Sequence, residues 1–281
     1  RPLPLLLALA FGSNAGSVAT PTGNPQNMLI ATESGIAYAR FTSLLGLPAL
    51  VSLVVVAAVL LVAFRHDLPP GPLPAPRLAR PVVRRREAVV SVLVLAGIVV
   101  AFLGGASLAW TAVSGGTILL VFSGRPSRGA IAQVDWNLLV FFAGLFIIVY
   151  GVGAVGLAGA MFDAVKPLLG ETVLSQAGVF GAFTVLASQV VSNVPFVLLA
   201  AGWMDGFSAP EFMWLSTALF STLAGNLTPV GSVANIIVLE SAGADGKIPF
   251  LQFLRFGATV TALTLAAGFG LLWLQRTWGW L

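Results

Sequence analysis

The chain has 281 residues, of which 58% are hydrophobic and only 9% are charged. Because a soluble globular protein carries roughly 25% charged residues, this composition excludes a chain that is surrounded by water. The chain has no cysteine and one histidine. The absence of cysteine excludes a disulfide framework and a thiolate metal site.

The apolar runs predict an all-α polytopic membrane protein whose first helix is interrupted. Residues 3–37 are mainly apolar but contain the octet Thr20-Pro21-Thr22-Gly23-Asn24-Pro25-Gln26-Asn27. Proline removes a backbone donor and glycine loosens the backbone, so we expect the helix to open here and to cross the membrane as two half-helices. Residues 46–64 form an unbroken apolar run, close to the ~20 residues that a bilayer requires. Residues 1–64 are therefore predicted to be the end of a first repeat.

A loop rich in proline and arginine follows at residues 65–87. It contains six of the fourteen basic residues of the chain. Proline favours an extended tether over a folded domain, and clustered basic residues are typical of a cytoplasmic loop. We expect this segment to be a cytoplasmic linker between two repeats.

Residues 88–281 are predicted to form a complete second repeat. The stretch 188–195, with the sequence SQVVSNVP, places polar residues and a proline within an apolar segment, which favours a re-entrant hairpin. Residues 155–170 combine glycines with charges and are expected to lie at the membrane interface. The predicted elements are spans at 88–105, 108–123 and 135–154, a hairpin at 173–203, a broken helix at 210–243 and a last span at 251–274.

The second broken helix repeats the first. The octet Thr228-Pro229-Val230-Gly231-Ser232-Val233-Ala234-Asn235 carries threonine, proline, glycine and asparagine at the places they have in the first octet, 208 residues earlier. Interrupted helices at corresponding positions of two halves are the best sequence pointer to the binding site of a transporter. For either octet alone, the alternative is a proline kink that neighbouring helices satisfy.

The distribution of basic residues predicts that the repeats are inverted. If the linker is cytoplasmic, eleven basic residues lie inside and three, Arg40, Lys166 and Arg276, lie outside, in agreement with the positive-inside rule. The first broken helix then runs outward, the second runs inward, and the C-terminus lies outside. We expect an integral protein of a bacterial inner (plasma) membrane.

The two repeats differ in length. The second has 140 residues before its Thr-Pro pair and the first has 19. We therefore expect an N-terminally truncated chain that lacks about 120 residues, among them a partner hairpin.

The candidate binding residues lie in the two breaks and at the hairpin tip. Opened helix ends present N–H groups to anions and carbonyls to cations, and uncharged side chains add further ligands. The candidate substrate- and ion-binding residues are Thr20, Pro21, Gly23, Asn24, Asn27, Ser192, Asn193, Asn226, Thr228, Pro229, Gly231, Ser232 and Asn235. No cofactor is expected except Na⁺ as the coupling ion, placed at Gly23, Asn24, Ser192, Asn193, Thr228 and Gly231. Two acids near the far ends of the broken helices are either interfacial end residues or proton carriers, namely Glu33 and Glu240.

Four stretches resemble the ion-transporter superfamily: 23–27, 135–144, 192–195 and 225–235. This superfamily includes citrate and dicarboxylate symporters, arsenite permeases and sodium/proton antiporters. The resemblance implies two inverted repeats with a site between hairpin tips and broken helices. Val194 stands where the dicarboxylate branch has threonine, and Ser192 stands where the antiporter branch has an acid. The nearest likeness is therefore to the loosely defined anion permeases of the superfamily.

The sequence predicts a secondary active transporter that moves a small anion, coupled to Na⁺ or H⁺. It does not predict an enzyme, since a phosphate loop at Gly246-Lys247 lacks its first glycine, replaced by Ser241. Two alternatives are an efflux permease for a metalloid such as arsenite and a non-transporting membrane scaffold subunit. The expected partners are a small anionic substrate and the lipid bilayer, not nucleic acid, and a homodimer is left open.

Overall fold

The computed structural model describes residues 2–66, 84–122 and 127–281, and the regular elements in these ranges are helices. The described residues form two compact units. The first contains residues 2–36, 40–66 and 145–281, and the second contains 37–39, 84–122 and 127–144.

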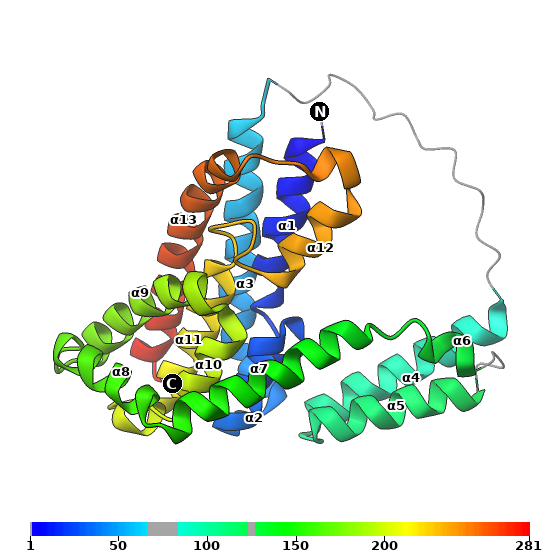
Figure 1. Ribbon diagram of the computed structural model, residues 1–281, viewed down its shortest axis with the longest axis horizontal. Helices are drawn as coiled ribbons and strands as arrows, with labels where there is room; N and C mark the ends of the chain where they lie inside the picture. Colours follow the sequence, from blue (N-terminus) through cyan, green and yellow to red (C-terminus); the bar gives the residue numbers. More distant parts are fainter. Residues whose placement is uncertain (1, 67–83, 123–126) are drawn as a thin grey trace. The chain divides into compact units, whose positions relative to one another are not determined.

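The first unit holds both interrupted helices and the hairpin (Figure 1). Its elements in chain order are α1 (Leu3–Ser17), η1 (Pro21–Gly23), α2 (Pro25–Ser34), α3 (Tyr38–Ala63), α8 (Leu157–Val165), η2 (Lys166–Leu168), α9 (Val173–Val191), α10 (Asn193–Ala201), η3 (Met204–Gly206), α11 (Pro210–Ala224), α12 (Val233–Ser241), η4 (Gly243–Gly246) and α13 (Phe250–Thr277).

The second unit is built on a pair of closely packed helices. A methyl group on Gly115 would lie 2.3 Å from Cδ1 of Ile98, so α4 and α5 are in close contact at this glycine. The elements are α4 (Arg85–Leu103), α5 (Leu108–Phe122), α6 (Ser127–Ile131) and the first part of α7 (Trp136–Ala154), which continues into the first unit.

Both octets interrupt a helix, as predicted. The first lies between α1 and α2, and the second lies between α11 and α12. The half-helix α1 packs against α12, and α2 packs against α11. Each leading half-helix therefore lies beside the trailing half-helix of the other repeat, and the two broken helices run antiparallel (Figure 1). This arrangement confirms the predicted inverted fold.

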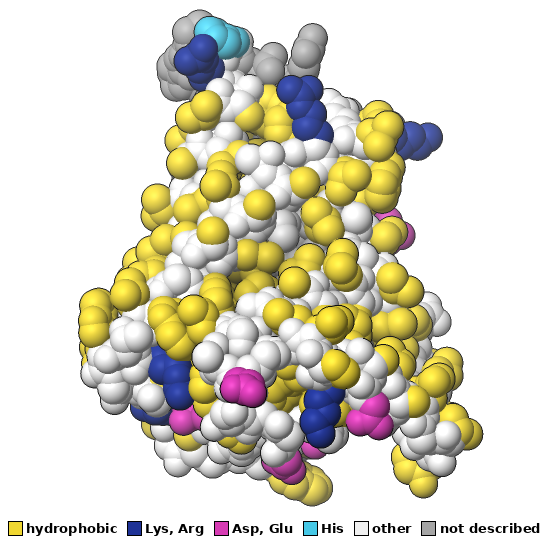
Figure 2. All heavy atoms as spheres, turned by 90° about the vertical axis from the view of Figure 1, so that its left-hand side faces the viewer, with side chains coloured by type: hydrophobic (Ala, Val, Ile, Leu, Met, Phe, Trp, Pro, Cys, Tyr) yellow, Lys and Arg dark blue, Asp and Glu magenta, His cyan; other side chains and the backbone are white. Residues whose placement is uncertain are grey.

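The described residues contain four helices that are long and apolar enough to cross a membrane, or up to five if one bent pair counts as a span. That pair, Leu139–Ala154 with Leu157–Leu168, bends by 72° where the sequence predicts a span followed by an interfacial segment. On the face drawn in Figure 2, charged side chains lie toward two ends, and the band between them is hydrophobic or uncharged. This is the surface of an integral membrane protein.

Helix α3 begins earlier than the predicted span at 46–64. Its first turns contain Arg40, whose charge argues against an apolar run on sequence grounds alone. In the structure, Nε of Arg40 donates to Oε1 of Glu211 at 2.9 Å, and both side chains are partly exposed. Because this partly exposed ion pair lies at the first turn of α11, α3 accommodates the charge before it enters the apolar region.

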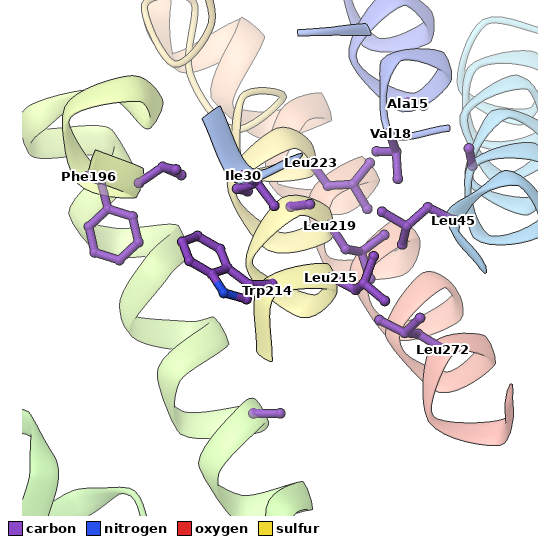
Figure 3. Packing of buried hydrophobic residues seen from close by; sticks show 14 of the residues in the cluster. Ala15, Val18, Ile30, Leu45, Phe196, Trp214, Leu215, Leu219, Leu223 and Leu272 are labelled. Atoms are coloured by element: carbon purple, nitrogen blue, oxygen red, sulfur yellow. The ribbon is translucent and has the colours of Figure 1, made fainter. Parts of the chain in front are cut away.

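The core of the first unit surrounds α11. Of its 15 residues, 13 are buried, as expected for a helix that neighbours cover on all sides. Figure 3 shows Leu215, Leu219 and Leu223 of this helix among side chains from several elements. These neighbours include Ala15 and Val18 of the first repeat, Leu45 of α3 and Leu272 of α13.

The predicted hairpin consists of α9 and α10, joined at Ser192. Aromatic rings hold its arms together: the centroids of Phe183 and Phe196 are 5.7 Å apart, and those of Phe180 and Phe196 are 6.1 Å apart. The longer arm packs directly on α11, where a methyl group on Gly181 would lie 2.5 Å from the ring of Phe220. The longer arm of the hairpin is therefore packed against the central broken helix.

The domain boundaries at 1–64, 65–87 and 88–281 remain predictions. Most of the linker, residues 67–83, lies outside the described residues.

The membrane topology is testable because the chain has no cysteine. We expect Ser208→Cys, in the exposed connection between α10 and α11, to react with an impermeant maleimide added to intact cells. Lys247→Cys, exposed between α12 and α13, should react only after the cells are opened. Labelling of the second variant from outside would reverse the predicted orientation.

Candidate binding site

The first break is an extended turn closed by a glycine. The backbone of Thr20 (φ −137°, ψ 152°) and of Asn24 (φ −151°, ψ 151°) is extended on either side of η1. A methyl group on Gly23 would lie 2.1 Å from the carbonyl oxygen of Ser17. The chain therefore folds back onto the end of α1, in a space that only glycine fits.

The second break has the same form. Ser232, which corresponds to Asn24 after the 208-residue offset, is also extended (φ −149°, ψ 142°). A methyl group on Gly231 would lie 3.0 Å from the carbonyl oxygen of Gly225. Since Gly225 is the counterpart of Ser17, both glycines face the same carbonyl of their own repeat.

One asparagine spans each break. Nδ2 of Asn27 donates to the carbonyl oxygens of Ser17 at 3.0 Å and Thr20 at 3.3 Å. In the second repeat, Nδ2 of Asn235 donates to the carbonyl oxygens of Gly225 at 2.7 Å and Thr228 at 3.0 Å. The acceptors lie ten and seven residues before the asparagine in both cases.

The two breaks are also joined to each other. Nδ2 of Asn14, on α1, donates to Oδ1 of Asn235 at 3.0 Å. Oγ1 of Thr222, on α11, donates to Oδ1 of Asn27 at 3.1 Å. Asn14 and Thr222 are themselves separated by 208 residues, so the links are reciprocal across the inverted repeat.

Further hydrogen bonds are specific to one repeat. Nδ2 of Asn14 also donates to Oδ1 of Asn226 at 2.9 Å, and Oδ1 of Asn14 accepts from Oγ of Ser232 at 2.8 Å. Around the first break, Nδ2 of Asn24 donates to Oγ of Ser17 at 3.0 Å. The network thus surrounds both openings with uncharged groups.

The hairpin reaches the second break through Gln189. Its Nε2 donates to the carbonyl oxygen of Ala224, the last residue of α11, at 3.0 Å. Its Oε1 accepts from Oγ1 of Thr228 at 2.8 Å. The same carbonyl also accepts from the backbone N–H of Leu227 at 3.0 Å, so the glutamine supplies a second donor at the end of the opened helix.

Three polar atoms near the tip and the second break are buried without a hydrogen-bond partner. They are Oγ of Ser188, Oδ1 of Asn193 and Nδ2 of Asn226, in residues that are 1%, 5% and 0% exposed. Between the first two lies Ser192, which has φ +71°, the only positive φ of a non-glycine residue in the described part of the chain. Unpartnered buried polar atoms and local strain are both typical of functional sites.

The structure brings most of the predicted site residues together and adds several that the sequence reasoning missed. The second break, with Asn226, Thr228, Gly231, Ser232 and Asn235, adjoins the hairpin through Gln189. The polar residues that were not predicted are Asn14, Ser17, Ser188, Gln189 and Thr222. The sequence contained one signal for Asn14 and Thr222, because these two polar residues are separated by the same 208 residues as the octets.

Among the described residues, the side chains that hydrogen-bond around the two breaks are uncharged. Glu33 and Glu240 lie in the last turns of α2 and α12 and are exposed, as the sequence placed them. Over the described ranges, no group of three or more His, Asp or Glu side chains could hold a metal ion.

Antiparallel broken helices, linked openings and a hairpin within a charge-poor helical unit define an integral membrane transport protein. The chain belongs to the citrate transporter family, whose sequence model matches residues 1–224. This membership confirms the resemblance to the ion-transporter superfamily.

Several curated relatives carry transporter names. An uncharacterized transporter of Mycobacterium tuberculosis is 31% identical over 294 residues, covering 97% of this chain and 67% of the relative. A silicon efflux transporter of Oryza sativa subsp. japonica is 29% identical over 342 residues, covering 96% of this chain and 70% of the relative. A transporter named arsB of Dictyostelium discoideum is 34% identical over 187 residues, covering 65% of this chain and 32% of the relative. Membrane transport is the function that the family and these relatives share.

Proposed function

We propose that the chain forms the core of a secondary active transporter that moves a small anion, driven by Na⁺ or H⁺. The observation that carries the proposal is the pair of matched, mutually bonded breaks beside a hairpin tip with unpartnered buried polar atoms. Broken helices of this kind bind substrates and coupling ions in transporters.

Two helix N-termini without side-chain caps are evidence that the substrate is an anion. Helices α2 and α10 begin at the first break and at the hairpin tip, and neither Asn24 nor Ser192 caps its helix with a side-chain hydrogen bond. The N-terminus of a helix carries a partial positive charge and unpaired N–H groups that suit a carboxylate or oxyanion. The buried, unpartnered Nδ2 of Asn226 adds a donor of the same kind.

Buried oxygen atoms near the hairpin tip are evidence that the coupling ion is a cation that oxygen atoms coordinate. Oδ1 of Asn193 and Oγ of Ser188 are buried acceptors without a partner. Hydroxyls, amide oxygens and carbonyls coordinate a hard cation such as Na⁺ without any titrating group. The octets contain no acid that could carry a proton, which favours Na⁺ over H⁺.

A neutral metalloid is the second candidate substrate. It is favoured by the uncharged lining of both breaks and by the relatives named silicon efflux transporter and arsB. Proteoliposomes loaded with silicic acid or arsenite should then release them, whereas an anion transporter should take up radiolabelled citrate. Failure to take up citrate would contradict a tricarboxylate substrate, and failure to release silicic acid and arsenite would contradict a neutral metalloid.

The coupling ion is tested in the same vesicles. We expect an imposed Na⁺ gradient at equal pH to drive citrate uptake at least ~10-fold above the rate without a gradient. The double variant Glu33→Gln with Glu240→Gln should retain this uptake, because both side chains are exposed at helix ends. Uptake that responds to a pH gradient alone and disappears in the double variant would show proton coupling.

A further inference from the structure

We infer that Asn27 and Asn235 are positioning residues that fix the carbonyls of the two breaks, and that Asn14 and Thr222 hold these asparagines in register across the inverted repeat. The inference rests on the proposed function, because it concerns the shape that the breaks offer to a transported solute and its coupling ion.

The hydrogen-bonding capacity of the two asparagines is used inside the protein. An asparagine amide has two N–H donors and one oxygen acceptor. In Asn27 and Asn235, both donors go to backbone carbonyls and the oxygen accepts from the opposite repeat. Both residues are 0% exposed. No donor is left for an anion, in contrast to Asn226, whose Nδ2 is unpartnered.

The acceptor carbonyls lie where an opened helix needs support. Ser17 is the last residue of α1, and Gly225 directly follows α11, so their carbonyls have no partner in a continuing helix. Thr20 and Thr228 begin the extended turns. By bonding the carbonyl at the end of the leading half-helix and the carbonyl at the start of the turn, the asparagine sets the directions of both. Both asparagines bond carbonyls ten and seven residues before them. This repetition argues against incidental packing as the origin of these hydrogen bonds.

The reciprocal links give the two breaks a common geometry. Asn235 is held from α1 and Asn27 is held from α11, each by a side chain at the corresponding position of the other repeat. The hydroxyl of Thr222 donates to Asn27, and the amide of Asn14 donates to Asn235 in the same way. The essential property is therefore a hydrogen-bond donor at positions 14 and 222.

The first test replaces the donor on α11 in full-length protein reconstituted in proteoliposomes. Thr222→Val keeps the volume and removes the hydroxyl, so we expect the half-saturating concentration for citrate to rise about tenfold at unchanged protein yield. Thr222→Ser restores the donor and should behave like the wild type. Thr217→Val is the matched control, because Thr217 is buried in the same helix and its hydroxyl donates to the carbonyl oxygen of Met213 in that helix.

The second test uses the repeat itself and needs no transported probe. Val230 is 68% exposed in the second break, and the rate of maleimide reaction with Val230→Cys reports the shape of the turn. Adding Asn14→Val should change this rate several-fold, whereas Asn14→Thr, which copies the side chain used on α11, should leave it within about twofold.

The outcomes separate the two proposals. If Asn14→Val alters the maleimide rate and Asn14→Thr does not, the positioning role stands even in a protein that fails to move citrate, and only the proposed substrate falls. If Thr222→Val transports like the wild type, or Asn14→Val leaves the maleimide rate unchanged, the positioning role is wrong.

Discussion

Replacing Gly23 by alanine should abolish transport, with a loss of at least ~100-fold in the rate of citrate uptake. The added methyl group would lie 2.1 Å from the carbonyl oxygen of Ser17, far inside van der Waals contact. Because the opposing atom belongs to the backbone, no side-chain rotation relieves the overlap, and the turn must move. A displacement that costs about 3 kcal/mol corresponds to a loss of that size.

Alanine substitutions at two further glycines provide comparisons for the transport rate of Gly23→Ala. Gly12→Ala, in α1, is the control, because nothing lies within 4 Å of the added methyl group. Gly231→Ala should be milder than Gly23→Ala, since its contacts begin at 3.0 Å and one of them is the movable side chain of Gln189. Equal rates for Gly12→Ala and Gly23→Ala would show that the first break does not contribute to the transport path.

The sequence predicts the broken helices well because their signals are local. Proline and glycine within an apolar run interrupt a helix wherever it packs, and a repeated octet marks the same interruption twice. The start of α3 at Tyr38 was not predicted, because Arg40 interrupts the apolar pattern there and its partner Glu211 lies 171 residues away in the sequence. Pairing over that distance leaves no trace in local hydrophobicity.

The polar network was only partly predictable for a related reason. Asn27 and Asn235 stand out inside the octets, but their partners Asn14 and Thr222 are single polar residues within helices. A lone asparagine or threonine in an apolar helix is usually a packing residue. Their role follows from the antiparallel arrangement, which places α1 beside α12 and α2 beside α11. Gln189 was missed likewise, because its acceptor belongs to α11.

Asn193→Ala should separate function from stability. The residue is 5% exposed and its Oδ1 has no partner within the protein. An unpartnered buried polar atom costs about 1–3 kcal/mol, so removing it should leave the melting temperature in detergent unchanged or raise it. If the atom serves a transported ion or solute, the same change should reduce citrate uptake by at least ~100-fold, since the ligand loses its partner in a buried site.

Ser188→Ala provides the comparison that makes this dissociation specific to the hairpin tip. Its Oγ is also buried without a partner, one helical turn before Ser192, so the variant should again keep its stability and lose transport. Ser216→Ala supplies the matched control: its Oγ is buried and unpartnered as well, but it lies within α11, away from both breaks. Stabilisation in all three variants, with transport lost only at positions 188 and 193, would place the bound solute or ion at the tip. A loss of stability in Asn193→Ala would instead mean that its amide supports the fold, because a residue kept for a ligand contributes nothing to folding when that ligand is absent.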